Sequence, residues 1–184
     1  MSSKRTSKHN RPVELKHTPY WACKDRHDNY NAWRYEALKS AYIEARRYAI
    51  GNVIDFKNGI QTACWILDSG LVIRVSRIEG EQFTSWRKEY GHRSFDLPIL
   101  NSGVIRDSYG EIIVRWCVCP RADAITEAQD EQWVNLVRTI HDEGYETRDL
   151  EYYAFGSGEY VKRYDQTGIV DGKAVLLDYE CAAR

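Results

Sequence analysis

Apolar runs separated by turn signals, between residues 52 and 120, constrain the fold of this 184-residue chain more than any other feature. The runs NVIDF, IQTACWIL and LVIRV are joined by Lys57-Asn58-Gly59 and Asp68-Ser69-Gly70. Two further runs flank the turn from Asp107 to Gly110. Asn-Gly and Ser-Gly between apolar runs are typical of antiparallel hairpins, because glycine adopts the positive φ that tight turns need. The region therefore predicts a five-stranded antiparallel sheet.

Helical patterns precede, interrupt and follow this strand-rich region. A short helix is expected over residues 79–91, between the third and fourth strands, and a longer one begins at Thr126, where Thr126 and Gln129 fit a capping box. Gly144 is a natural stop for that helix. Segregated strands and helices imply an α+β class. Apolar residues at helical spacing form one stripe at Tyr35, Leu38, Tyr42, Ala45 and Ala49 and another at Trp133, Leu136, Val137 and Ile140.

Length, charge and cysteine usage limit the class of protein. The length favours one compact domain, and a formal net charge of -1 argues against general nucleic-acid binding. No segment is apolar enough to cross a membrane. Five cysteines without a Cys-x-x-Cys motif indicate a reduced, cytoplasmic protein. Cys117 and Cys119 lie in a strand-like run, which favours buried thiols over a zinc site.

The first 19 residues are polar, basic and aperiodic. This composition is typical of a disordered tail. An alternative is an arm that docks on an acidic partner, and a further one is a nucleic-acid-binding segment. The rest of the chain is divided into a helical segment at 20–50, a sheet-rich lobe at 51–120 and a second lobe at 121–184.

Three charged residues could together carry chemistry. Arg74 lies inside the apolar run LVIRV, Asp149 follows the second helix, and Asp178 ends the apolar run KAVLLD. Each alone has an ordinary explanation as surface or turn decoration. Phosphoryl transfer, however, needs a cation on the nucleotide phosphates, a carboxylate near the attacking hydroxyl and a carboxylate on the metal. The three residues occur along the chain in that order.

At these motifs the chain resembles the protein-kinase-like family, in the reduced form of bacteriophage early serine/threonine protein kinases. IHDEGYETRDLEYYAFG resembles the helix and catalytic loop of the family, and VLLDYE resembles the strand that leads to the metal site. LVIRV resembles the phosphate-binding strand, FKNGIQTACWIL the glycine-containing hairpin over the nucleotide, and EQFTSWRKEY the helix after the cation strand. The resemblance implies a minimal protein-kinase-like fold, with a five-stranded antiparallel N-lobe sheet, one helix and a truncated helical C-lobe.

The resemblance also implies roles for particular residues. Asp149 would orient the substrate hydroxyl and Asp178 would hold magnesium. Arg74 would position the phosphates of ATP with a glutamate of the short helix as its partner. Glu89 fits that place because it lies beside the apolar stripe of the helix, whereas Glu81 falls on the opposite face. Glu79 shares the stripe but lies at the expected helix start, where a carboxylate complements the helix dipole. Asn58 and Gly59 would lie over the nucleotide, so ATP and magnesium are the implied cofactors.

Departures from the family pattern predict impaired catalysis. Arg74 replaces a lysine, and a planar guanidinium does not substitute for a point charge where phosphate is gripped in one geometry. Thr147 stands at the loop histidine, and Ala154 stands at a metal-binding asparagine and offers no ligand atom. Glu180 replaces a glycine after the metal aspartate, and no activation segment follows it. The bulk of Trp65, near the glycine hairpin, also favours weak or absent nucleotide binding.

The leading functional hypothesis is a catalytically impaired kinase-like protein, a phage pseudokinase that binds and modulates or inhibits a host protein in the host cytoplasm. The alternative is an active serine/threonine protein kinase acting on host proteins. The aromatic group after Gly144 has two readings of equal weight, packing of the loop onto the helix or a protein-contact surface. Its members are Tyr145, Tyr152, Tyr153, Phe155, Tyr160 and Tyr164.

Overall fold

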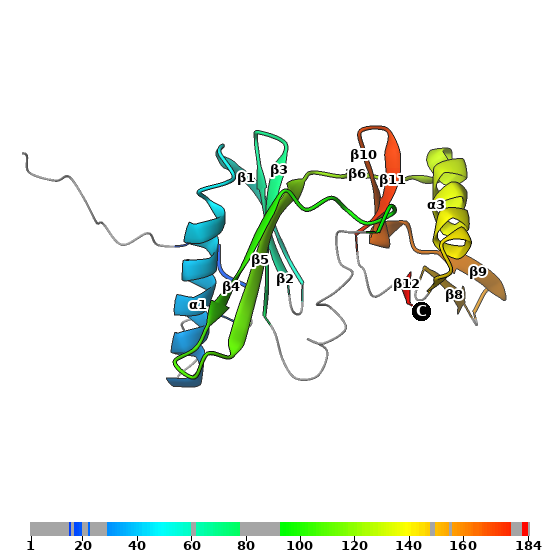
Figure 1. Cartoon of the computed structure of the whole chain (residues 1–184). Coiled ribbons are helices and arrows are strands. Elements are labelled where there is room, and N and C mark those ends of the chain that lie inside the picture. Colours follow the sequence, from blue (N-terminus) through cyan, green and yellow to red (C-terminus); the bar gives the residue numbers. More distant parts are fainter. Residues whose placement is uncertain are drawn as a thin grey trace, which may run out of the picture.

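The computed structural model describes residues 15, 17–19, 22, 29–59, 62–77, 93–147, 150–154, 156–177 and 182–183. Within them the chain forms two lobes that lie side by side in Figure 1. The first lobe contains helix α1 and a five-stranded sheet, and the second contains helix α3 and several short strand pairs. The α+β class predicted from the sequence is confirmed.

The five-stranded sheet is antiparallel throughout, with strand order β1-β2-β3-β5-β4. Gly70 and Gly110 end two of the predicted turns with φ of 79° and 85°, in the left-handed region that glycine adopts without steric cost. The predicted sheet and both turns are confirmed. The strands are β1 (Val53–Asn58), β2 (Thr62–Leu67), β3 (Leu71–Arg77), β4 (Asn101–Arg106) and β5 (Ile112–Pro120).

Helix α1 (Asn29–Ala45) covers one face of this sheet (Figure 1). Successive strand side chains point to opposite faces, so Ala63, Trp65 and Leu67 of β2 are buried toward the helix. They pack with Leu38 and Ala41 of α1, which have no exposed surface. The predicted stripe is confirmed within α1, where Tyr35, Leu38 and Ala45 are buried and Tyr42 packs against the cluster. Ala49, its fifth member, is also buried but lies beyond the end of the helix. We call this cluster the first-lobe core.

Helix α3 (Asp130–Asp142) organises the second lobe. A 3-10 turn (Glu127–Gln129) precedes it, and the backbone N–H of Thr126 donates to Oε1 of Gln129 at 3.2 Å, as the predicted capping box requires. Gly144, at φ 81°, follows the end of the helix. The predicted apolar stripe of α3 is confirmed. It packs in a cluster that we call the second-lobe core, formed by Phe95, Ile125, Trp133, Leu136, Ile140, Tyr145, Leu150, Leu176 and Ala182.

Short strands, rather than helices, make up most of the described second lobe. The expectation of a helical lobe is wrong here, because α3 is its one α-helix among the described residues. The new strands are only two to four residues long, too short to show an alternating apolar pattern. They are β6 (Asp123–Ala124), β7 (Glu146–Thr147), β8 (Glu151–Ala154), β9 (Glu159–Lys162), β10 (Thr167–Val170), β11 (Lys173–Leu176) and β12 (Ala182–Ala183).

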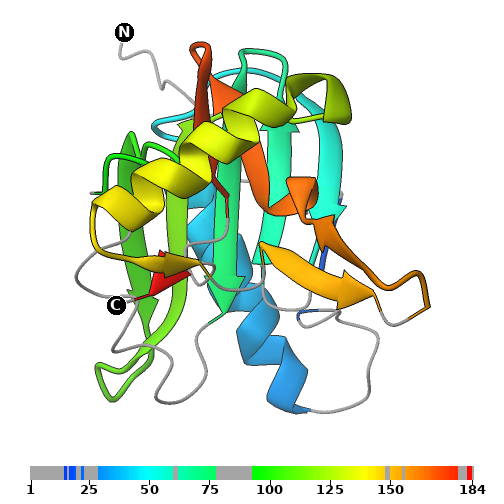
Figure 2. The ribbon, with the colours of Figure 1, turned by 90° about the vertical axis from the view of Figure 1, so that its right-hand side faces the viewer.

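These short strands form three separate sheets. β11, β10 and β6 make a three-stranded sheet, β12 pairs with β7, and β8 pairs with β9 as a hairpin. Figure 2 shows α3 and the small sheets in front of the five-stranded sheet, with α1 behind it. The second lobe therefore lies opposite the face of the large sheet that α1 leaves open.

A seam of apolar side chains joins the lobes. Leu97, Cys119, Val170 and Val175 form a buried cluster, with Val72 packed against it. We call it the seam cluster. Backbone hydrogen bonds hold its two sides in place. The N–H of Leu97 donates to the carbonyl of Leu176 at 3.0 Å within the second lobe, and the N–H of Arg121 donates to the carbonyl of Gly70 at 2.8 Å, next to the β3–β5 pairing of the first lobe.

The described residues near the N-terminus lie on the first lobe. Leu15 packs against the first-lobe core, and the ring of His17 stacks on Phe56 with centroids 5.3 Å apart. The end of the segment predicted to be a tail therefore contacts the sheet. Residues 1–14 and the short helix expected over 79–91 lie outside the described residues.

Candidate functional site

Arg74 lies on the face of the large sheet that is turned away from α1. Its neighbours on β3, Ile73 and Val75, belong to the first-lobe core, so the Arg74 side chain points to the opposite face. In the sheet register Arg74 lies between Cys64 of β2 and Cys117 of β5. This face is the one that the second lobe covers, so the guanidinium lies at the junction of the lobes.

The guanidinium of Arg74 reaches the end of a second-lobe strand. Its Nη1 donates to the carbonyl of Leu177 at 3.1 Å, across 103 residues of sequence. Leu177 directly precedes Asp178, the predicted metal-binding carboxylate. The structure thus brings the predicted cation and the backbone next to Asp178 together. Asp178, Asp149 and Glu89 themselves lie outside the described residues, so their roles stay predictions.

Asn58 and Gly59 lie at the exposed tip of the β1–β2 hairpin. The N–H of Gly59 donates to the carbonyl of Thr62 at 2.8 Å, which closes the turn. Neighbouring strands are about 4.8 Å apart, so β1 and β3 are separated by about 10 Å. The two hairpin residues therefore lie on the same sheet as Arg74 but two strands away from it.

The predicted interference from Trp65 is wrong. Trp65 is 2% exposed and packs in the first-lobe core, with its ring centroid 4.9 Å from that of Tyr42 and 5.2 Å from that of Phe56. It therefore lies on the opposite face of the sheet from Arg74. The sequence could not decide this, because the face of every strand residue depends on where the register begins.

Thiols line the sheet beside Arg74. Cys117 and Cys119 are buried, which confirms the prediction for this pair, and Cys64 is half-buried. Burial raises the pKa of Cys64, partly offset by the charge of Arg74. The contact with Cys117, together with burial, raises the pKa of Cys119, whose Sγ donates to the carbonyl of Val72 at 3.7 Å. Over the described residues no three His, Cys, Asp or Glu side chains are arranged to hold a metal ion.

A buried ion pair in the second lobe was missed from the sequence. Arg93 and Asp96 have side chains 7% and 1% exposed, and Nη2 of Arg93 lies 2.7 Å from Oδ1 of Asp96. Nη1 of Arg93 donates to the carbonyl of Ala182 at 2.9 Å, and the guanidinium lies over the rings of Phe95 and Tyr145. The network fixes residues 93–96 onto the second lobe. An Arg and an Asp three residues apart are too common in sequences to have signalled it.

A second network connects the start of α3 to the segment that follows β9. Asp130 accepts hydrogen bonds from Nζ of Lys162 at 2.6 Å and from the hydroxyl of Tyr164 at 2.7 Å. The lysine contact is the main cause that lowers the pKa of Asp130. The hydrogen bond to Asp130 raises the pKa of Tyr164 to about 12. Because Nζ of Lys162 also lies 4.9 Å from the centroid of Trp133, the network holds the end of β9 against the helix.

The aromatic residues after Gly144 were expected either to pack onto the helix or to form a protein-contact surface, and the structure shows both buried and exposed members. Tyr145 is buried in the second-lobe core, and Tyr164 packs against the same core. Tyr152, Tyr153 and Tyr160 are 50%, 44% and 73% exposed on the β8–β9 hairpin. Packing therefore accounts for the first two, and a surface role stays open for the other three. Phe155 lies outside the described residues.

Two of the departures from the family motif have defined positions. Ala154 lies in β8, paired with Glu159 of β9, rather than in an irregular loop. Thr147 lies in β7, where its Oγ1 is 3.3 Å from Nε2 of His141. Neither side chain offers a carboxylate or amide oxygen to a metal ion. The described part of the catalytic-loop-like segment is thus built as short strands.

Comparisons with known proteins add no relative. Neither the scan against family models nor the search of curated proteins found a match to this chain. Among the described residues no helix is long and apolar enough to span a membrane.

Proposed function

We propose that this chain is a catalytically impaired kinase-like protein that acts by binding a partner protein. The observation that carries the proposal is the contact between Arg74 and Leu177. Kinase chemistry needs a cation on the third strand of the first lobe and a metal-binding carboxylate that faces it from the second. Arg74 is on β3, and its guanidinium holds the backbone one residue before Asp178.

The surroundings of Arg74 support impairment. Its guanidinium already donates to a backbone carbonyl, whereas phosphate gripping needs those donors aimed at the ligand. The seam cluster fills the junction beside it with Leu97, Cys119, Val170 and Val175. Ala154 brings no metal ligand. A chain with these features retains the two-lobed arrangement and loses transfer, so binding is the activity left to it.

The phage-like motifs suggest that the partner is a host protein. The active alternative shares the position of Arg74, since it also requires a cation beside the Asp178 segment. In an active enzyme Asp149 would orient the substrate hydroxyl while Arg74 and Asp178 position the phosphates and magnesium.

A phosphotransfer assay separates the two functions. The chain and its Asp149→Ala variant are incubated with radiolabelled ATP, magnesium and a bacterial extract. The impaired protein gives the same labelling with and without Asp149. Label that appears in any protein with wild type and disappears with Asp149→Ala contradicts the proposal and establishes the active enzyme.

Thermal unfolding tests nucleotide binding separately. A nucleotide present at about 100 times its Kd would stabilise the folded state by about 2.7 kcal/mol. We expect millimolar ATP with magnesium to leave the melting temperature unchanged. A rise that Arg74→Ala abolishes would show instead that the junction is a working nucleotide site.

A further inference from the structure

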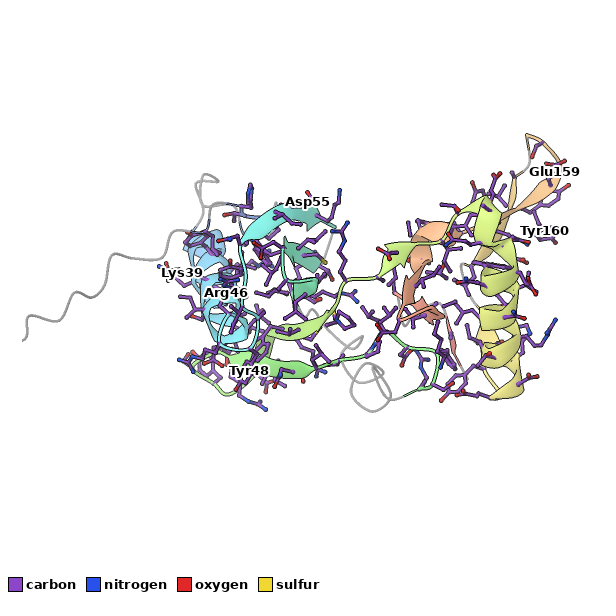
Figure 3. All side chains as sticks on the ribbon, turned by 90° about the horizontal axis from the view of Figure 1, so that it is seen from above. Lys39, Arg46, Tyr48, Asp55, Glu159 and Tyr160 are labelled. Atoms are coloured by element: carbon purple, nitrogen blue, oxygen red, sulfur yellow. The ribbon has the colours of Figure 1, made fainter. Side chains whose placement is uncertain are left out.

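The β8–β9 hairpin presents tyrosines at the outer end of the second lobe. Figure 3 shows Tyr160 and Glu159 beyond α3, on the side away from the large sheet. Tyr160, Tyr152 and Tyr153 are 73%, 50% and 44% exposed, in a hairpin of only eight strand residues. Packing of the described lobe therefore leaves much of three large aromatic side chains in contact with water.

The hairpin register places a tyrosine pair beside a carboxylate. Tyr153 and Tyr160 are directly opposite each other, with ring centroids 5.3 Å apart and an edge-on arrangement. Glu151, two residues before Tyr153, is exposed on the same face of the hairpin, whereas Tyr152 and Glu159 lie on the other face. We call Tyr153, Tyr160 and Glu151 the tyrosine patch. Aromatic faces next to carboxylates favour a cationic ligand, since ring quadrupole and negative charge attract the same group.

The base of the hairpin is held firmly. Lys162, opposite Glu151, is tied to Asp130 of α3 and lies over Trp133. The patch is therefore presented on a scaffold fixed to the helix, so little ordering has to accompany binding. Among the described residues β8 and β9 pair only with each other, so their outer edges can accept an extended chain.

The negative formal charge of residues 121–184 favours a positively charged ligand. Residues 121–184 contain 14 Asp and Glu against seven Lys and Arg, a formal charge of -7. Residues 1–120 carry +6, which gives the net -1 of the chain. Such a field attracts cationic partners and repels nucleic acid and anionic surfaces.

We propose that the tyrosine patch binds a basic, extended segment of a partner protein. Its Lys or Arg side chains lie on the rings of Tyr153 and Tyr160 and pair with Glu151. This inference deepens the partner-binding part of the proposed function and rests on it. It does not involve Arg74 or nucleotide.

Binding of a fluorescent nona-arginine peptide to the full chain tests the proposal at low ionic strength. Tyr160→Ser and Tyr153→Ser each weaken binding about two- to fivefold, the effect of one exposed cation–aromatic contact. Tyr109→Ser is the matched control, since Tyr109 is 90% exposed on the β4–β5 turn of the first lobe. It changes nothing.

Two further kinds of variant complete the experiment: glutamates changed to glutamine, and a tyrosine changed to phenylalanine. Glu151→Gln weakens binding, whereas Glu111→Gln, an exposed position beside the β4–β5 turn, does not. Tyr160→Phe keeps the ring and retains binding, which separates loss of the contact from loss of the fold. In about 1 M salt, where the Debye length is about 3 Å, the peptide dissociates.

The possible results test the tyrosine patch separately from the proposal of impaired phosphotransfer. Absence of peptide binding to wild type, or equal losses from Tyr160→Ser and Tyr109→Ser, overturns the tyrosine patch. Peptide binding that persists in the Tyr153→Ser, Tyr160→Ser double variant also overturns it, and places partner binding elsewhere on the chain. The phosphotransfer assay with Asp149→Ala tests impairment independently of all these results.

Discussion

The two lobes of this protein reach a folded state by different means. The first is built on strands of six to nine residues whose side chains alternate between α1 and the junction with the second lobe. The second has strands of two to four residues arranged around α3. In a long strand, the alternation of apolar and polar residues specifies the register of pairing. A two-residue strand is too short for such a pattern, so its pairing depends on how the surrounding lobe positions it.

The cores of the two lobes also differ in how much they depend on buried charged groups. The first-lobe core consists of apolar side chains, among them Trp65, Leu38 and Ile73, which are almost fully buried. The second-lobe core lies against the buried Arg93–Asp96 pair, which also bonds to the carbonyl of Ala182. Short segments cannot bury enough apolar surface to fix their positions, so charge-assisted hydrogen bonds specify them. The difference predicts where each lobe is most vulnerable.

The largest effect is expected from the buried ion pair. Asp96→Ala leaves Arg93 buried without its counter-charge, which costs about 3–5 kcal/mol of the free energy of unfolding. Urea unfolding followed by circular dichroism measures the loss.

The control for this variant is Asp165→Ala, which removes an aspartate bound to Arg163 at 2.8 Å with its side chain 63% exposed. Exposed pairs contribute about 0–1 kcal/mol, so the second variant should be much milder. Similar costs for both would mean that the second lobe does not depend on its buried pair.

Core truncations test whether the lobes unfold together. Leu38→Ala in the first lobe and Ile140→Ala in the second each remove a fully buried side chain and cost about 2–5 kcal/mol. Because the seam cluster and the hydrogen bond from Arg74 to Leu177 connect the lobes, both variants should lower the midpoint of one common transition. Tryptophan fluorescence and circular dichroism should coincide. A variant that shifts only part of a two-step curve would show that the lobes are independent.

Glycines at close contacts test the packing of each lobe. A Cβ at Gly103 of β4 would lie 2.6 Å from the Trp116 ring, and one at Gly168 of β10 would lie 2.7 Å from Cβ of Ala122. Replacement of either by alanine should cost about 1–3 kcal/mol through overpacking. Gly156→Ala is the control, since no atom lies within 4 Å of its added Cβ. A neutral Gly168→Ala would indicate looser packing in the second lobe.

The smallest effect is the pH dependence of the Asp130–Tyr164 contact. The pKa of Tyr164 is raised to about 12, so its contribution to stability is present below the unfolded value of about 10 and is lost as the pH rises through about 12. The pKa of Asp130 is lowered, so its contribution is present above the unfolded value of about 3.9 and is lost as the pH falls through the folded value. Absorbance titration of tyrosinate should show one late-titrating group that Tyr164→Phe removes. Asp130→Asn should bring that titration to lower pH, and an unchanged titration in Asp130→Asn would exclude the hydrogen bond as its cause.

Sequence patterns predicted the first lobe well because its signals are local. Alternation within β2, the glycines at 70 and 110 and the stripe of α1 each depend on neighbours a few residues away. The capping box at Thr126 and the stop at Gly144 are equally local. Local signals do not choose which face of a strand meets α1, so the sequence could not show that Trp65 packs in the first-lobe core, away from Arg74.

By itself, the sequence determined the class of the fold, the hairpins of the large sheet and the two described helices. Tertiary structure alone decided the pairing of β7 with β12, the bond from Arg74 to Leu177 and the bond from Arg93 to Ala182. These contacts join residues 103 and 89 positions apart in the last two cases. No pattern in a short window encodes such a contact, because it forms only when the folded chain brings together polar groups that are distant in the sequence.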